Sequence, residues 1–381
     1  MTLSRRKTLA LLGGGTILAA TAAVGLTVTR MPKAAFQPWA AAGTYAEPRM
    51  RALSYAILAP NPHNRQPWLV DLRTEGEVTL RVDTDRLLPH TDPFNRQIVV
   101  GLGCFLELMR IAAAQDGYGI DLTLFPDGED ATGLDQRRVA VARFVPGAAQ
   151  PEPELFAQVL GRRSLKEPFD TTRPVDAATL ASVLAVVERT TVDGSVAAGD
   201  IAELREISHA ALRIELDTER TYKESVDLFR IGSREVVANP DGIDFTGPLF
   251  EAMAVTGAFT RESAMDRTSI AYVEGEKAVF ANIDTAMGHL WQVTPTNTRA
   301  DQIAAGRDWL RLNLATAAAG LGMQPLSQGL QEYPEMADIY AQLHKRLAPD
   351  GGTVQMLARI GYGPEIGKSP RWPLESKIVN A

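Results

Sequence analysis

The chain has 381 residues, of which 45% are hydrophobic and 22% charged, a composition typical of folded globular proteins and long enough for two domains. Its formal net charge of −7 predicts no binding to nucleic acid, because phosphate contacts need clustered Lys and Arg. The single cysteine, Cys104, excludes an internal disulfide and a cysteine-rich metal site. Its apolar surroundings predict a buried, unreactive thiol.

The first thirty residues have the pattern of an export signal. Arg5, Arg6 and Lys7 precede an almost uncharged run from Leu9 to Thr29. The paired arginines resemble the twin-arginine signal, whose export machinery carries folded proteins, often with a cofactor already inserted. We therefore expect the protein in the periplasm or on the outer face of the inner membrane. A run of about 20 apolar residues can also span a bilayer, so the pattern leaves cleavage and membrane anchoring both open.

A turn-rich segment from Ala59 to Trp68 follows a predicted helix at residues 49–58. Its prolines and asparagines force the chain to turn. The amide groups of Asn61, Asn64 and Gln66 can both donate and accept hydrogen bonds, which suits a ligand with carbonyls and ring nitrogens. Taken alone, the segment is more typical of an ordinary loop that caps a helix.

A stretch of the first half returns in the second half without a gap. Residues 98–117 align with residues 303–322 at a constant offset of 205, and both copies predict a long buried helix that ends at a glycine. Strand-like segments follow at 139–144 and 355–360. The repeat predicts a duplicated α+β fold with halves at 45–148 and 152–375, joined by the linker Pro146–Pro153.

Three further segments, all in the second half, carry polar or flexible residues. Residues 161–166 place Arg162, Ser164 and Lys166 at alternate positions, where they can converge on a phosphate; a solvated charge run is the alternative. Residues 323–329 form a loop that can present backbone N–H groups to a flat ring. Lys368 and Arg371 add two cations near the C-terminus.

Together these segments resemble the nitroreductase family over most of residues 45–375. Members of that family carry an Arg-x-Ser-x-Arg/Lys phosphate motif, an Asn-x-Gln-Pro-Trp loop, a Pro-x-x-Gly loop facing the flavin N5, and a late Lys/Arg pair. The Asn-x-Gln-Pro-Trp loop is the most specific match, and the C-terminal pair, with one extra residue between its members, is the least specific. The matching residues are Ala59, Pro60, Asn64, Gln66, Pro67 and Trp68; Arg162, Ser164 and Lys166; Pro325, Leu326, Ser327 and Gly329; and Lys368 and Arg371.

The order of the motifs differs from that of a typical member, in which the phosphate motif comes first and a homodimer shares its flavins. Here the loop occurs only in the first half and the phosphate motif only in the second. The resemblance therefore implies a monomeric pseudo-dimer with one FMN site between its halves, as in the Acg-like branch of the family. Asn61 and Pro62 replace the paired serines of the family, which puts the hydrogen bonds at the flavin edge in doubt.

Residues 218–285 match no family element and are expected to form a lid over the flavin. They include Phe245, Phe250, Met253 and Phe259, a set more typical of internal packing than of a substrate pocket.

Other classes of site find no support. The histidines at 63, 90, 209, 289 and 344 lack the spacing of a metal site. No Gly-x-Ser-x-Gly elbow marks a hydrolase, and no Gly-x-Gly-x-x-Gly follows a predicted strand.

The resemblance implies an FMN-dependent oxidoreductase that transfers hydride or electron pairs through flavin N5, with NAD(P)H as a possible donor and an unknown small-molecule acceptor. Arg162, Ser164, Lys166, Lys368 and Arg371 would hold the phosphate and ribityl tail. Asn61, Asn64, Gln66 and the loop 325–329 would position the ring. No side chain is singled out as an acid or a base. The alternative is a flavin-sequestering protein with a lidded, catalytically silent FMN.

Overall fold

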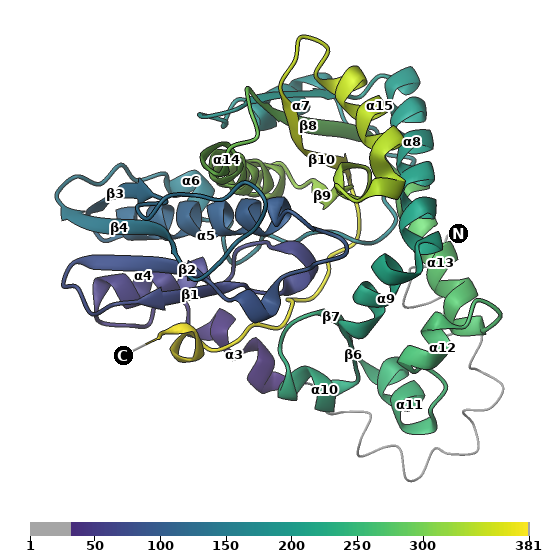
Figure 1. Ribbon diagram of the computed structural model, residues 1–381, viewed down its shortest axis with the longest axis horizontal. Coiled ribbons are helices and arrows are strands. Elements are labelled where there is room, and N and C mark those ends of the chain that lie inside the picture. Colours follow the sequence, from purple (N-terminus) through teal and green to yellow (C-terminus); the bar gives the residue numbers. More distant parts are fainter. Residues whose placement is uncertain (1–31, 380–381) are drawn as a thin grey trace.

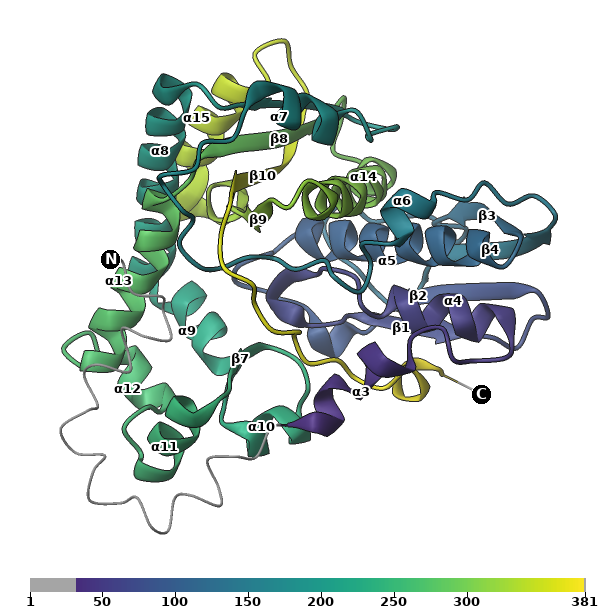
Figure 2. The same ribbon diagram turned by 180° about the vertical axis from the view of Figure 1, so that it is seen from behind.

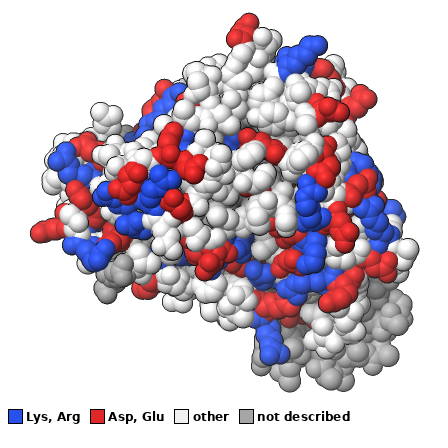
Figure 3. Space-filling view, in the orientation of Figure 1, with Lys and Arg blue, Asp and Glu red and all other residues white. Residues whose placement is uncertain are grey.

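The computed structural model describes residues 32–379, so the predicted export signal lies outside the described residues. The described chain is a mixed α+β fold with two four-stranded antiparallel sheets, a small two-stranded sheet, and helices around them (Figure 1). On the face shown in Figure 3, acidic and basic side chains alternate in small groups.

The first sheet has the strand order β1-β2-β4-β3. In β2, buried residues alternate with partly exposed ones, the period expected of a strand with one face in the core. The helices before and between these strands pack on the sheet, and Leu53 of α4, Phe105 of α5 and Trp68 of β1 are buried in a shared core. The elements are α3 (Lys33–Ala41), α4 (Pro48–Ala56), β1 (Trp68–Asp71), β2 (Glu77–Val82), α5 (Arg96–Gln115), β3 (Tyr118–Leu124) and β4 (Arg138–Pro146).

The second sheet has the order β5-β8-β10-β9, the same path as the first sheet when strands are numbered within each half. Its strand β10 is buried along almost its whole length. The predicted linker lies between β4 and α6, the first helix of this half. The elements outside the insertion described below are α6 (Pro153–Phe156), α7 (Ala177–Leu184), β5 (Thr191–Ser195), α8 (Ala198–Asp217), β8 (Gly288–Thr294), α14 (Arg299–Ala318), β9 (Gly322–Pro325), α15 (Ala337–Leu347) and β10 (Thr353–Gly361).

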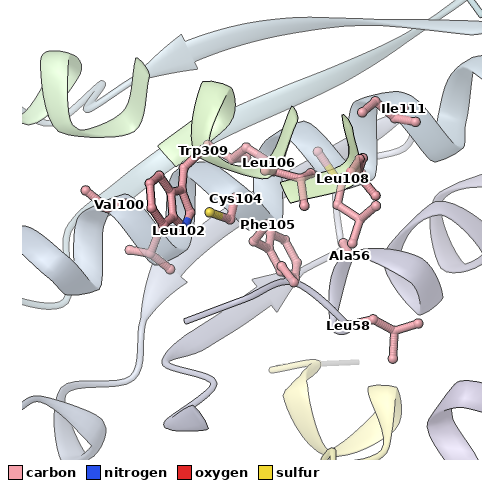
Figure 4. Close-up of a cluster of buried hydrophobic side chains, with 14 of the residues drawn as sticks. Ala56, Leu58, Val100, Leu102, Cys104, Phe105, Leu106, Leu108, Ile111 and Trp309 are labelled. Carbon is pink, nitrogen blue, oxygen red and sulfur yellow. The ribbon is translucent and has the colours of Figure 1, made fainter. Parts of the chain in front are cut away.

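The two repeated helices, α5 and α14, pack directly against each other at the centre of the molecule. They approach so closely that a Cβ on Gly306 would lie 2.8 Å from the Cα of Gly103. Cys104 is buried at this crossing, with Trp309 nearby (Figure 4), and its Sγ lies 3.1 Å from the carbonyl oxygen of Gly306. Burial raises the pKa of the Cys104 thiol to about 12, so it stays protonated.

One prediction from the repeat is wrong, namely the position at which the second helix ends. The glycine in the left-handed conformation after α5 is Gly117, as expected, with φ of +85°. After α14 it is Gly320, with φ of +67°, whereas the aligned Gly322 begins β9. Gly322 is instead required for packing, because a Cβ there would meet the side chain of Leu165 at 2.4 Å. The helix therefore ends before the position that the alignment predicts.

The segment 218–285 forms a helical insertion between α8 and β8, at one side of the molecule (Figures 1 and 2). It has its own apolar cluster, in which Phe245, Phe250 and Phe259 are buried and Met253 packs against them. These aromatic side chains are thus internal packing, as their pattern predicts. The elements are α9 (Glu219–Asp227), β6 (Phe229–Ile231), α10 (Ser233–Ala238), β7 (Ile243–Phe245), α11 (Pro248–Thr256), α12 (Arg261–Met265) and α13 (Ile270–Asp284).

After β10 the chain crosses back to the first half and ends beside α3 and β1 (Figure 2). The N–H of Arg371 donates to the carbonyl of Ala35, and the N–H of Val379 donates to the carbonyl of Val70, both at 2.8 Å. This crossing brings the C-terminal cations to the turn-rich segment of the first half.

The segment Arg96–Gln115 is the one helix of the described chain that is long and apolar enough to cross a membrane. It is α5, the buried central helix, so its apolar character is explained by the core. The apolar run 9–29 lies outside the described residues.

Candidate functional site

The turn-rich segment folds into a tight loop that includes a single 3-10 turn, Pro62–Asn64. His63, Asn64 and Gln66 all have positive φ, between 46° and 52°, a conformation that costs energy for residues other than glycine. The side chain of Asn61 stabilises the loop, because its Oδ1 accepts a 2.7 Å hydrogen bond from the N–H of Gln66. Such strain is maintained only where the surroundings hold the loop in place.

The surroundings that hold the loop are the C-terminal segment and the insertion. Asn64 Oδ1 accepts a 2.6 Å hydrogen bond from Arg371 Nη1. Gln66 Oε1 accepts from the N–H of Trp372, and Gln66 Nε2 donates to the carbonyl of Pro240, both at 2.8 Å. These amide groups, selected from sequence as ligands for a flavin ring, are therefore engaged with the protein itself.

Four cations from the second half gather beside this loop and around Trp39, and we call Arg162, Arg163, Lys368 and Arg371 the basic cluster. The guanidinium carbons of Arg163 and Arg371 lie 4.7 Å and 5.5 Å from the centroid of the Trp39 ring, and Lys368 Nζ lies 5.7 Å from it. Arg162 and Arg371 share an acceptor, since each donates to the carbonyl of Leu58 at 3.1 Å.

Arg162 and Arg371 are almost completely buried, with 4% and 2% of their surface exposed. Burial lowers the pKa of Arg162 to about 10, with a further contribution from Arg163. Burial, together with Arg162 and Arg163, lowers the pKa of Arg371 to about 9. The charge of Asp244 acts in the opposite direction and raises the pKa of Arg371.

The partners of the basic cluster are neutral acceptors. Arg371 donates to the carbonyls of Ile57, Leu58 and Ala59, at the negative end of the α4 dipole. Arg162 Nη1 donates to Asn313 Oδ1 at 2.7 Å. Arg163 Nε is buried and has no hydrogen-bond partner among the described residues. The cluster thus carries a positive charge that partial negative charges offset only in part, and it can accept an anion.

The remaining predicted residues are Ser164 and Lys166 of the 161–166 segment and the loop 325–329. The N–H of Leu165 donates to the carbonyl of Met323, which joins this segment to the loop 323–329. Ser164 is half-buried and Lys166 is exposed. Burial lowers the pKa of His63 to about 3, and the charges of Lys166 and Arg65 contribute to this shift.

The loop 325–329 is held by the second sheet and the helices beside it. Pro325 pairs with Ala358 of β10, and the N–H of Leu326 donates to the carbonyl of Leu357 at 2.8 Å. Ser327 is half-buried. Gly329 packs closely against α15, since a Cβ there would meet Leu343 at 2.5 Å. Within residues 32–379, no hydrogen bond or ion pair joins this loop to the basic cluster.

Sequence reasoning missed Trp39, Asn313 and Glu215. Trp39 belongs to no motif, and Asn313 is one of several polar residues on α14, so no signal in the sequence distinguished either residue. Glu215 on α8 is buried beside the loop 325–331, and its Oε2 accepts a 3.0 Å hydrogen bond from Gln331 Nε2. Burial, assisted by Glu224, raises the pKa of Glu215 to about 7, while Gln331, Lys166 and Gln328 lower it.

No cluster of His, Cys, Asp or Glu in the described part of the chain could hold a metal ion. The histidines are dispersed, and His289 is buried in β8, where burial lowers its pKa to about 3.

No protein-family model matches the chain. It is 27% identical over 334 residues to a Mycobacterium tuberculosis protein named as a candidate NAD(P)H nitroreductase, acg, with 84% of this chain and 90% of that protein covered. A second M. tuberculosis protein of the same description is 25% identical, with 87% and 93% covered.

Two solved structures share a lower similarity. The FMN-dependent nitroreductase NfnB of Mycobacterium smegmatis, solved with NADPH, is 19% identical, with 58% of this chain and 96% of that chain covered and a TM-score of 0.36. A candidate nitroreductase from Anabaena variabilis is 11% identical, with 76% and 69% covered and a TM-score of 0.40. Both scores are low, so the comparison depends on the sequence relatives. These relatives support the nitroreductase family, a family of oxidoreductases, for this chain.

Proposed function

We propose that the chain binds one FMN between its halves and works as an oxidoreductase, with NAD(P)H as the donor suggested by the names of its relatives. The basic cluster is the observation that carries the proposal. It buries Arg162 and Arg371 against the loop of the other half, where both donate to neutral acceptors. A phosphate monoester would supply the missing negative charge.

The residues of the basic cluster and the loop are better suited to bind a phosphate than to bind the edge of the flavin ring. Arg163 Nε is a buried donor without a partner, and guanidinium groups match the geometry of phosphate oxygens. In contrast, the amides of Asn64 and Gln66 already have protein partners. We therefore assign the basic cluster to the phosphate, and to Asn61, Asn64 and Gln66 the role of fixing the loop against which the ring would lie.

When bound, FMN supplies hydride or electron-pair transfer through N5 of its ring. The protein positions the cofactor and excludes water. The strained loop is fixed by Asn61 and by the C-terminal segment. The insertion closes over it, because the N–H of Gly242 donates to the carbonyl of Asn64 at 3.4 Å and Asp241 forms an ion pair with Arg65. This contact makes the insertion a lid.

We infer a single flavin site in a chain that arose by duplication. The structure of the two halves supports the duplication. Both sheets have the same strand order, and the repeated helices α5 and α14 pack together as equivalent helices of a dimer would. The loop and the basic cluster each occur once, in different halves. We propose one FMN per chain and a functional monomer.

We also propose export by the twin-arginine machinery, supported by Arg5, Arg6 and the apolar run that follows them. Folding before export is compatible with the absence of disulfides in a chain that has one cysteine.

The test starts with the full chain, saturated with FMN and then freed of unbound flavin. We expect one FMN per chain by absorbance, and oxidation of NAD(P)H when a nitroaromatic or quinone is added. The variants R162M and R371M should bind FMN at least tenfold more weakly, because each loses charge-assisted hydrogen bonds to the phosphate. R143M, at an exposed ion pair on β4, is the matched control and should bind FMN normally.

Each part of the proposal can fail separately. No uptake of FMN would overturn the flavin site, and two FMN per chain would overturn the single-site geometry. Bound FMN that dithionite reduces but no donor reduces would favour a flavin-sequestering protein. That alternative is not favoured, because the relatives are named as nitroreductases.

A further inference from the structure

Lys377 is a buried lysine of the C-terminal segment that belongs neither to the basic cluster nor to any of the motifs. It ends the 3-10 turn η6 (Leu374–Lys377), and only 3% of its surface is exposed. The next residue, Ile378, pairs with Val70 of β1, which fixes the turn to the first sheet. Because a buried ammonium group is costly unless it has a partner, the contacts of Lys377 are informative.

The partner of Lys377 is the carbonyl group of Gln66, to which its Nζ donates a 2.8 Å hydrogen bond. Gln66 is completely buried and has a φ of +51°, a conformation that costs energy for a residue other than glycine. Its N–H donates to Asn61, and its side-chain amide is held by Trp372 and Pro240. Lys377 therefore holds the remaining polar group of this strained residue.

The strength of this hydrogen bond depends on the charge of Lys377. Burial lowers the pKa of the Lys377 ammonium group to about 7, and the charges of Arg86 and Arg65 contribute. Asp83 and Asp241 act in the opposite direction, but both form ion pairs with Arg86. A charged donor forms a hydrogen bond roughly twice as strong as a neutral donor does, so the loss of the proton weakens the hold on Gln66.

The charged groups near Lys377 come from the turn after β2, the loop, the insertion and the turn η6 itself: Asp83, Arg86, Arg65, Asp241 and Glu375.

We propose that Lys377 is a positioning residue of the flavin site and acts through Gln66. Its ammonium group fixes the carbonyl of Gln66, and with it the loop against which the ring would lie. The inference rests on the proposed function and adds to it a residue outside the motifs. Protonated Lys377 favours the conformation of the loop that binds flavin, and neutral Lys377 favours it less.

The test compares the Kd for FMN of the full chain and of the variant K377M at pH 6 and pH 9. At pH 6 we expect K377M to bind FMN about tenfold more weakly, because it lacks the charged donor. At pH 9, where Lys377 is neutral, the two should differ by less than about threefold. The ratio of the two Kd values cancels the titration of the FMN phosphate, which both proteins share. K345M, at an exposed position on α15, is the matched control and should bind as wild type does at both pH values.

A ratio that is the same at pH 6 and pH 9 would overturn the inference, because it would show a structural role that does not depend on charge. If K377M does not fold, K377Q, which keeps a neutral donor, takes its place with the same expected change of ratio.

Hydrogen exchange without flavin separates this inference from the proposed function. At pH 6 the backbone N–H groups of residues 61–68 should exchange faster in K377M than in wild type, and unchanged exchange would overturn the inference alone. Failure of the wild type to take up FMN would contradict the proposed function, whatever the exchange shows.

Discussion

Two groups of buried arginines in this chain have opposite electrostatic surroundings. At the crossing of α5 and α14, Glu107 is completely buried and lies within 4 Å of the guanidinium groups of four arginines. Three further carboxylates complete this group, which we call the balanced cluster: Glu107, Glu152, Glu188 and Asp308 with Arg110, Arg189, Arg307 and Arg311.

In the balanced cluster, each cation has a carboxylate. The pKa of Glu107 falls to about 2 because Arg307, Arg110 and Arg189 outweigh the effect of burial. In the basic cluster, Arg162 and Arg371 are at least as buried, yet they face carbonyls and each other. Ion pairs at the crossing join the halves, whereas the cations at the loop donate to neutral acceptors. Under the proposed function, this difference separates an arginine group that serves the fold from one that serves binding.

The largest expected effect is at Glu107. The variant E107Q should lower the free energy of unfolding by about 3–5 kcal/mol, because it leaves buried guanidinium groups without their carboxylate. Urea unfolding measures it. D121N, which breaks an exposed ion pair with Arg143, should cost less than about 1 kcal/mol. If E107Q costs no more than D121N, the balanced cluster does not hold the halves together.

Glu215 is a buried carboxyl group without an arginine beside it. Protonation, rather than an ion pair, removes the cost of burying its negative charge. Its pKa is raised from 4.5 to about 7, so its contribution to stability is complete below pH 4.5 and is lost as the pH rises through 7. The variant E215Q should match wild type at pH 4.5 and be more stable at pH 8 by up to about 3 kcal/mol.

Thermal or urea unfolding at the two pH values measures the difference. E206Q, at an exposed position on the same helix, is the control and should show no pH-dependent gain. A gain for E215Q that is the same at both pH values would show that packing, not ionisation, is responsible.

The basic cluster should bind the phosphate of FMN, so a flavin without a phosphate should stabilise the protein less. At FMN concentrations 100 times Kd, the free energy of unfolding should rise by about 2.7 kcal/mol. Riboflavin, which lacks the phosphate, should give a much smaller rise at the same concentration. Equal stabilisation by both flavins would mean that the cluster contributes nothing to binding, and R371M should bring the FMN effect down to that of riboflavin.

Asp241 lies between the two extremes, as one buried carboxylate of the insertion that is shared by Arg65, Arg86 and Arg230. The variant D241N should cost about 2 kcal/mol, less than E107Q, because these arginines remain partly exposed and can recover solvation. Hydrogen exchange should show faster opening of residues 218–285 than in wild type. Unchanged exchange there would show that the insertion is held by its apolar contacts alone.

Much of the local structure could be predicted from the sequence. The long apolar helix at 98–117, the strand at 139–144 and the packing role of Phe245, Phe250 and Phe259 follow from periodicity and composition. The sequence predicts that the second helix ends two residues later than it does. Two glycines follow this helix, and only packing against Leu165 distinguishes Gly322 from the cap at Gly320.

The candidate site was less predictable. Its residues were selected by motif, but the side-chain amide of Gln66 forms hydrogen bonds with Trp372 and Pro240, which are far away in the sequence. Trp39 had no motif to mark it. Glu215 and Gln331 looked like ordinary helix and loop residues, and only the burial of both made them notable.

By itself, the sequence determined that the chain is a mixed α+β protein with a repeated helix and strand, since those patterns depend on neighbouring residues. It also placed the loop and the cations in different halves. Only the tertiary structure decided that Arg162 and Arg371 meet at the carbonyl of Leu58 while Arg307 and Arg311 meet at Glu107. Burial and the distances between charges set the role of an arginine, and both depend on chain segments that the sequence keeps far apart.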